Sequence, residues 1–372
     1  MSEYQYYEFR TIHRHLTPAQ RAEVAKLSSH GDTTSTSFSV DYSYGNFKHD
    51  PQDVLARYFD AFFYIANWGS AQLMFRFPKG VIDTRSLEPF CIQGQVTVDY
   101  KIVDDSLILS FDLNEEDGYD WVEDSGQLSG VLGLYDAILN GDLRALYLAW
   151  LGAIDTGVDD EDEFDDETLE PPVPPNLASL STELEAFVEM FGIDQDLIEV
   201  AAKTNQATAT ANADSGVDIE ALPAAERDDF IRRLLQGEEN LASKLRLRLR
   251  ELQPNVIHYE PTGTRTVGEL LAGRQKIAQT RKLAAEAARE VARRAKMAEL
   301  AARGDSAWRE VERLIEAKNS EGYKNAAILL QQLGELATEQ KQERIFFARL
   351  EQIRTLYSRR SAFMRELRQR NL

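Results

Sequence analysis

The alternation of hydrophobic and polar residues predicts a mixed first part and a helical second part. Helices are expected at 17–28 and 50–69, and one or two more at 128–154. Strands are expected at 4–15, 34–44, 73–77, 95–103 and 107–113, the last two as a hairpin around Asp104-Asp105. This order predicts an α+β fold with helices packed on one face of a sheet, and a ferredoxin-like layout is the specific hypothesis.

Amphipathic patterns over the rest of the chain predict an all-helical half. The expected helices are 181–203, 222–235, 239–252, 266–303, 308–317, 323–337, 342–357 and 361–370. In the longest of them, small and apolar residues recur every seven positions, as in a coiled coil: Leu270, Ile277, Ala284, Val291 and Ala298. The helices after Gly304 resemble tetratricopeptide-type helical hairpins, although no strict repeat period is present.

Composition marks the borders between five expected parts. Residues 155–170 hold ten acidic residues and a proline-rich run follows them, so this segment is expected to be an extended, solvated linker. The parts are an acidic α+β domain (1–154), the acidic and proline-rich linker (155–176), a helical domain (177–260), a long basic alanine-rich helix (261–304) and a helical-hairpin domain (305–372).

Charge is distributed unevenly along the 372 residues, whose net charge is −20. Residues 261–372 hold 23 Lys and Arg against 14 Asp and Glu, whereas no Lys or Arg lies between Arg144 and Lys203. The long helix is therefore a candidate contact for phosphates or for an acidic partner, with a solvated helix face as the alternative. Its candidate residues are Arg274, Lys276, Arg281, Lys282, Arg289, Arg293, Arg294 and Lys296.

Residues with catalytic or metal-binding potential form no recognisable motif. His13 and His15 would share one face of a strand, a spacing that can bind a metal, but the arginines beside them oppose a dication. The segment 112–123 has oxygen-bearing residues at alternate positions, as in a calcium loop, but Asp117 stands where that loop has glycine. The single cysteine, Cys91, can form neither an internal disulfide nor a cysteine-based zinc site.

Phosphate-loop, dinucleotide, serine-hydrolase and zinc-protease motifs are missing from the sequence. We therefore expect no enzyme activity and no cofactor, with an unrecognised metal site at His13 and His15 as the remaining enzyme hypothesis. The longest apolar stretch, 145–154, is shorter than the roughly 20 residues of a membrane-spanning helix. The first ten residues do not have the pattern of a signal peptide. These features predict a cytoplasmic protein without a membrane partner, and they leave its oligomeric state open.

Several segments resemble an uncharacterised family of bacterial proteins. They are Tyr4–Phe9, Tyr58–Gly69, Glu170–Pro175, Leu222–Gly237 and Arg265–Leu271. Such proteins accompany SWIM-type zinc-finger proteins, whose tails look similar to residues 308–372 of this chain. One cysteine cannot supply the ligands of such a finger, and no activity or site residue carries over. The resemblance implies a bacterial origin and an accessory role in a nucleic-acid-related complex.

These observations favour a non-catalytic adaptor or scaffold that acts through protein–protein contacts of its helical half. An alanine-rich helix edge buries little apolar surface, so the long helix is expected to need a contact surface, in the same chain or in a partner. The alternative is a nucleic-acid-associated accessory protein that binds phosphates through the basic 265–303 helix.

Overall fold

The structure is a computed structural model that describes residues 3–12, 14–114, 126–156, 165–203, 219–236, 238, 241–252 and 263–372. The chain divides into two compact units, Met1–Ile277 and Ala278–Leu372. We call them the sheet unit and the helical unit. The predicted fold class is confirmed, because a sheet with packed helices is followed by a long helix and helical hairpins.

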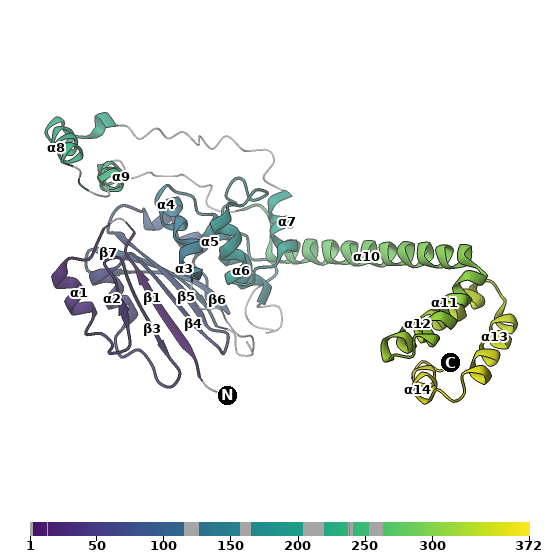
Figure 1. Ribbon diagram of the computed structural model, residues 1–372. Coiled ribbons are helices and arrows are strands. Elements are labelled where there is room, and N and C mark those ends of the chain that lie inside the picture. The colour runs from purple at the N-terminus through teal and green to yellow at the C-terminus, as the bar shows by residue number, and fades with distance from the viewer. Residues whose placement is uncertain are drawn as a thin grey trace. The chain divides into compact units, whose positions relative to one another are not determined.

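Within the described residues, the sheet unit contains one sheet of seven strands in the order β2-β3-β1-β4-β5-β7-β6 (Figure 1). All pairings between these strands are antiparallel. The first four strands and the two helices between them follow the order strand, helix, strand, strand, helix, strand, and the sheet order β2-β3-β1-β4 is that of a ferredoxin-like layout. The ferredoxin-like hypothesis is therefore confirmed for this part of the sheet, which β5, β7 and β6 extend beyond β4. The strands are β1 Gln5–Arg10, β2 Asp32–Thr33, β3 Ser37–Tyr42, β4 Ala61–Ala66, β5 Ala71–Pro78, β6 Val96–Val103 and β7 Ser106–Leu113.

The segment 50–69, predicted as one helix, is a helix followed by a strand. Helix α2 spans Pro51–Tyr58 and begins at Asp50, whose side chain accepts a hydrogen bond from the Gln52 amide at 2.8 Å. In β4, Phe62 packs on one face of the sheet, while Phe63 packs on the other. Because both faces of β4 are buried, its residues form a continuous apolar run that periodicity cannot distinguish from a buried helix.

Helices cover both faces of the sheet, not one face as expected (Figure 1). On one face, α1 (Pro18–Val24) and α2 pack over Phe9 and Phe38. On the other face, helices pack over Phe75 and Phe111. They are α3 Gln127–Val131, α4 Gly133–Leu139, α5 Arg144–Thr156, α6 Thr182–Met190 and α7 Gln195–Lys203.

The proline-rich part of the predicted linker is packed into the sheet unit. Residues 157–164 lie outside the described residues, but Glu170, Pro171 and Pro172 are buried. Val173 of this segment packs against the core that also contains side chains of α6 and α7 and of the first turn of the long helix. The predicted borders at 154 and 176 therefore do not separate folded parts, since residues on both sides share one core.

The other helices predicted after residue 222 are present in the structure. Helix α8 spans Ala224–Leu235, α9 spans Leu241–Leu252 and α10 spans Val267–Arg303. Gly304, with a φ of 49°, separates α10 from the hairpins of the helical unit. These are formed by α11 Asp305–Glu316, α12 Ser320–Glu339, α13 Glu343–Leu356 and α14 Ser361–Gln369.

The helical unit has its own hydrophobic core, arranged around α12. This helix contacts α11, α13 and α14, and its Leu330 is fully buried. Val311, Phe346 and Phe363 supply side chains to the same core from the three neighbouring helices. Among the residues that the structure describes, no helix in either unit combines the length and apolar character needed to cross a membrane.

Candidate interaction surfaces

Part of α10 is exposed on all sides. From Ala278 to Lys296 each side chain is exposed except that of Glu290, which is half-exposed. The predicted heptad positions therefore have different environments. Leu270 is buried in the sheet unit, whereas Val291 has 68% of its surface exposed. The exposed stretch is rich in alanine, whose high helix propensity helps to keep it helical.

The first of the eight predicted interaction residues lies inside the sheet unit. Arg274 contacts Asp155 of α5, and its Nε lies 2.9 Å from Asp194 Oδ2, just before α7. Lys276 and Arg281 also have interaction partners. Arg274 thus neutralises acidic residues of its own chain, and the prediction that it forms part of an outer binding stripe is not supported by its position.

Arg293 and Arg294 share one carboxylate on their own helix. Each has its Nε 2.8 Å from an oxygen of Glu290, and Arg293 also contacts Glu339 of α12. The hydrogen bonds from both arginines lower the pKa of Glu290 to about 2. These ion pairs hold the two guanidiniums close to the helix surface.

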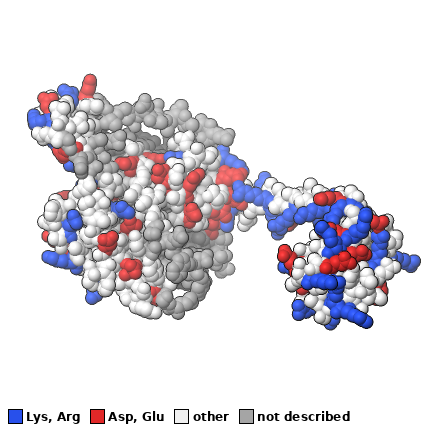
Figure 2. Space-filling model, in the orientation of Figure 1, with Lys and Arg blue, Asp and Glu red and all other residues white. Residues whose placement is uncertain are grey.

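Four basic residues of α10 share one side of the helix. Lys282, Arg289, Arg293 and Lys296 follow the spacing i, i+7, i+11 and i+14, which keeps them within one helical face. Lys282, Arg289 and Lys296 are exposed. We call these four residues the basic stripe. Figure 2 shows Lys and Arg side chains over the visible face of the helical unit, whose residues 278–372 hold 20 Lys and Arg and 13 Asp and Glu.

A buried ion pair joins the proline-rich segment to the chain just before α10. Nε and one terminal nitrogen of Arg265 donate to the two carboxylate oxygens of Glu170, at 2.9 and 2.8 Å. The Tyr147 hydroxyl of α5 donates to the same carboxylate at 3.0 Å. Burial, with the neighbouring charge of Glu170, raises the pKa of Tyr147 well above its usual value. All three groups have partners, which suits a structural contact.

The same ion pair explains why residue 263 is a glycine. A Cβ atom added to Gly263 would lie 1.9 Å from Cγ of Glu170, so no larger residue can approach the ion pair this closely. Arg265 also donates to the carbonyl oxygen of Val200 at 2.9 Å, which ties α7 to the same point. Arg265 and Arg274 thus bring positive charge to the region between Arg144 and Lys203, which contains no basic residue.

The helical unit contains a groove of about 320 Å³ where α10, α11, α12 and α13 meet. Its walls include the buried side chains of Leu333 and Phe346 and the half-buried side chain of Trp308. The ring centroids of Trp308 and Phe346 lie 5.8 Å apart. Ile345 also lines the groove and has 60% of its surface exposed. The groove therefore offers aromatic and aliphatic surface to a side chain from outside.

A charged side chain stands at the edge of this groove. The guanidinium carbon of Arg349 lies 5.3 Å from the centroid of the Trp308 ring, a cation–π contact. A terminal nitrogen of Arg349 lies 2.6 Å from Asp305 Oδ1. Both charged side chains are substantially exposed, at 42% for Arg349 and 73% for Asp305. No local signal in the sequence marks this site, because Trp308 and Arg349 are distant in the chain.

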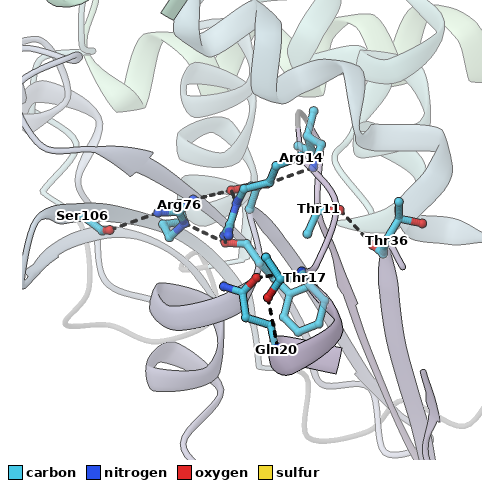
Figure 3. A network of polar contacts seen from close by, with 10 residues as sticks. Thr11, Arg14, Thr17, Gln20, Thr36, Arg76 and Ser106 are labelled. Carbon is cyan, nitrogen blue, oxygen red and sulfur yellow. Dashed lines mark hydrogen bonds and ion pairs between the residues drawn. The ribbon is translucent and has the colours of Figure 1, made fainter. Parts of the chain in front are cut away.

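A second polar cluster lies within the sheet unit, at Asp60 between α2 and β4 (Figure 3). One carboxylate oxygen of Asp60 accepts from Nε of Arg14 at 3.3 Å and from Arg76, and the other accepts from the Ile12 amide at 3.0 Å. Arg76 also donates to Ser106 on β7 at 3.4 Å. These bonds use both oxygens of Asp60 and connect four segments of the sheet unit, which suits a structural junction.

Most residues of the candidate metal sites lie outside the part of the chain that the structure describes. His13 and residues 115–123 of the calcium-like segment lie outside the described residues. His15 is exposed. In the part of the chain that the structure describes, no group of three or more His, Cys, Asp or Glu could hold a metal ion.

Cys91 is half-buried, and its thiol lies 3.5 Å from the carbonyl oxygen of Leu87. Burial, together with nearby carboxylates, raises the pKa of Cys91 to about 11. The thiol therefore remains protonated at neutral pH, whereas a nucleophilic cysteine needs a stabilised thiolate. The structure thus agrees with a packing role for this residue.

No family model, no curated protein and no solved structure matches the chain. The resemblance to bacterial proteins that accompany SWIM-type zinc-finger proteins stays a prediction. Arguments about function therefore rest on the groove, the basic stripe and the charge of the helical unit.

Proposed function

We propose that the protein is a non-catalytic adaptor whose helical unit binds an acidic protein segment in the groove beside Trp308. The observation that carries this proposal is the exposed Ile345 next to a tryptophan that Arg349 covers. An apolar side chain of a partner can bury itself against these residues, as in helix-in-groove recognition. The excess of Lys and Arg in residues 278–372 favours an acidic partner.

Interface hot spots are enriched in Trp and Arg and lie in pockets that exclude water on binding. The presence of Trp308 and Arg349 at the groove therefore supports this proposal. Nucleic-acid backbones need positive charge but no aliphatic anchor such as Ile345. The buried Leu330 core allows the helical unit to hold the groove in shape. A cytoplasmic location is part of the same proposal.

Replacing Ile345 by aspartate is expected to prevent binding of the partner. Full-length protein and the Ile345→Asp variant would each be used as bait in extracts of the native host, with the bound proteins quantified by mass spectrometry. We expect a stoichiometric partner with the wild type and at least about tenfold less with the variant, because a charge then replaces an apolar anchor. The matched control is Leu356→Asp on the same helix, which is 70% exposed and does not line the groove. Equal recovery by Ile345→Asp and wild type, or no stoichiometric partner at all, would contradict the proposal.

The basic stripe favours a second candidate function, binding of a nucleic-acid backbone. Lys282, Arg289 and Lys296 are exposed on one side of a helix whose stretch 278–296 is exposed on all faces. Side chains placed in this way can contact successive phosphates and release their counterions.

Reversing the charge of three residues of the basic stripe tests this second candidate function. Binding of a labelled DNA duplex to the full chain is measured by fluorescence polarisation at several salt concentrations. We expect affinity to fall with salt, and the triple variant Lys282→Glu, Arg289→Glu, Lys296→Glu to lower the logarithmic salt slope by about 3. A matched triple reversal at Arg344, Arg359 and Arg365, which are also exposed, should leave more binding. Absence of binding by the wild type at low salt ends this candidate.

A further inference from the structure

Helix α8 presents a row of exposed apolar side chains. Ile231, Leu234 and Leu235 have 51%, 65% and 84% of their surface exposed, and their spacing i, i+3, i+4 places them on one face. No residue of α8 is buried. A 12-residue helix is marginal in water without a packing surface. Within the described residues, nothing covers the apolar row of α8.

Helix α9 meets the opposite side of α8 mainly through ion pairs. Nε of Arg248 lies 2.7 Å from Glu226, and Glu238, which follows α8, contacts both Arg233 and Lys244 at 2.6 Å. These pairs occupy the inner side of the α8–α9 hairpin and leave the apolar row on the outer side.

The hairpin has little core of its own. Leu222, Leu241 and Leu249 are buried, but none of them belongs to the hydrophobic clusters of the sheet unit or the helical unit. Folded pieces of fewer than about 40 residues usually need oligomerisation or a covalent or metal link for stability. A second copy of the chain can supply this stability by covering the apolar row.

The charges beside the row are complementary to those of a second α8. Asp228 is exposed and lies on the same side as Ile231, and the side chain of Arg232 is 64% exposed. The first half of α8 holds three acidic residues and Arg227, whereas the second half holds Arg232 and Arg233 and no acidic residue. When two copies pack antiparallel about a twofold axis between residues 231 and 232, Ile231 of each packs against Leu234 of the other, and Asp228 of each lies within one helical turn of Arg232 of the other. The existing contact of Arg232 with Asp229, at 3.0 Å, is exposed and weak enough to rearrange.

We propose that α8 is a self-association surface and that its occupant is α8 of a second copy of this chain, packed antiparallel. This contact is separate from the groove and provides two grooves per assembly. Multivalent binding then strengthens attachment to a partner that carries repeated acidic segments.

Sedimentation equilibrium of the full chain tests the association. At about 100 µM we expect a mass twice the 42.1 kDa of one chain, falling to 42.1 kDa on dilution. The variant Leu234→Asp, Leu235→Asp should remain at 42.1 kDa under the same conditions. The matched control Leu283→Asp changes a leucine of α10 that is 59% exposed, and it should retain the association. A wild-type monomer at this concentration, or an oligomer that survives in the α8 variant, overturns the proposal.

A charge exchange tests the antiparallel packing without changing the apolar row. Asp228→Arg and Arg232→Asp should each weaken association by about tenfold, because two symmetric attractions become repulsions. The double variant should recover the wild-type dissociation constant. Failure of the double variant to recover it would overturn the antiparallel arrangement. The groove variant Ile345→Asp should sediment as the wild type does, so a failure of the proposed function is distinguishable from a failure of self-association.

Discussion

Replacing Arg265 by alanine is expected to lower the free energy of unfolding of the sheet unit by about 3–5 kcal/mol. The reason is that Glu170 has no exposed surface and takes two hydrogen bonds from the Arg265 guanidinium. Without Arg265, a carboxylate remains buried with a tyrosine hydroxyl as its partner, and two carbonyl oxygens at the end of α7 lose a donor.

Urea denaturation followed by circular dichroism measures this loss, and hydrogen exchange with mass spectrometry locates it. The matched control is Arg85→Ala, whose side chain is 79% exposed and pairs with Asp83, and which should leave the free energy of unfolding nearly unchanged. A companion variant, Glu170→Leu with Arg265→Met, should be more stable than Arg265→Ala because it buries no unpaired charge. If Arg265→Ala and Arg85→Ala have the same stability, the ion pair is not the structural contact described above.

Replacing Leu330 by alanine is expected to destabilise the helical unit by about 2–5 kcal/mol and to leave the sheet unit unchanged. Leu330 is fully buried in the core that α12 shares with α11, α13 and α14. Truncation to alanine removes apolar contacts and leaves a cavity. The two units have separate cores, so the effect should be confined to residues 278–372.

Hydrogen exchange of the full chain separates these regions directly. We expect amide protection to fall in α11 to α14 and to persist in β4 and β5. Leu356→Ala, at a position that is 70% exposed, serves as the control and should change stability by about 0.5 kcal/mol or less. An equal loss of protection in the β-strands would show that the units unfold together and would refute their independence.

Local signals in the sequence are sufficient to predict elements that have one apolar side and one polar side. The β6–β7 hairpin turns at Asp104, which has a φ of 53°, where two acidic residues interrupt the apolar alternation. The helix predicted from residue 17 begins with a capping box, in which Thr17 and Gln20 each accept a hydrogen bond from the other's backbone amide. The amphipathic pattern of 239–252 predicts a helix, and α9 confirms it.

Elements that depend on distant residues were predicted less well. Strand β4 was interpreted as helix because burial on both faces removes the alternation that marks a strand. The acidic and proline-rich segment was interpreted as solvated because the cation that neutralises Glu170 lies 95 residues away, at Arg265. Charge runs within a segment do not show which distant residue will neutralise them.

The same limitation applies to the candidate sites. Counting basic residues on α10 grouped Arg274 with Arg289, although Arg274 binds carboxylates of the sheet unit. The sequence alone does not reveal the groove, because tertiary packing brings Trp308 of α11 beside Ile345 and Arg349 of α13. Composition favours the helical half as the place of contact between molecules, but it does not indicate the residues that form the groove.

The burial of Val267 and Leu270 determines where the gene can be divided when the two halves are produced as separate polypeptides. A fragment that starts at residue 261 carries both side chains away from the core of the sheet unit, and it deprives Glu170 of Arg265. Its counterpart, ending at 260, would expose apolar surface and would aggregate readily. A division after Ile277 leaves each polypeptide with its complete interior.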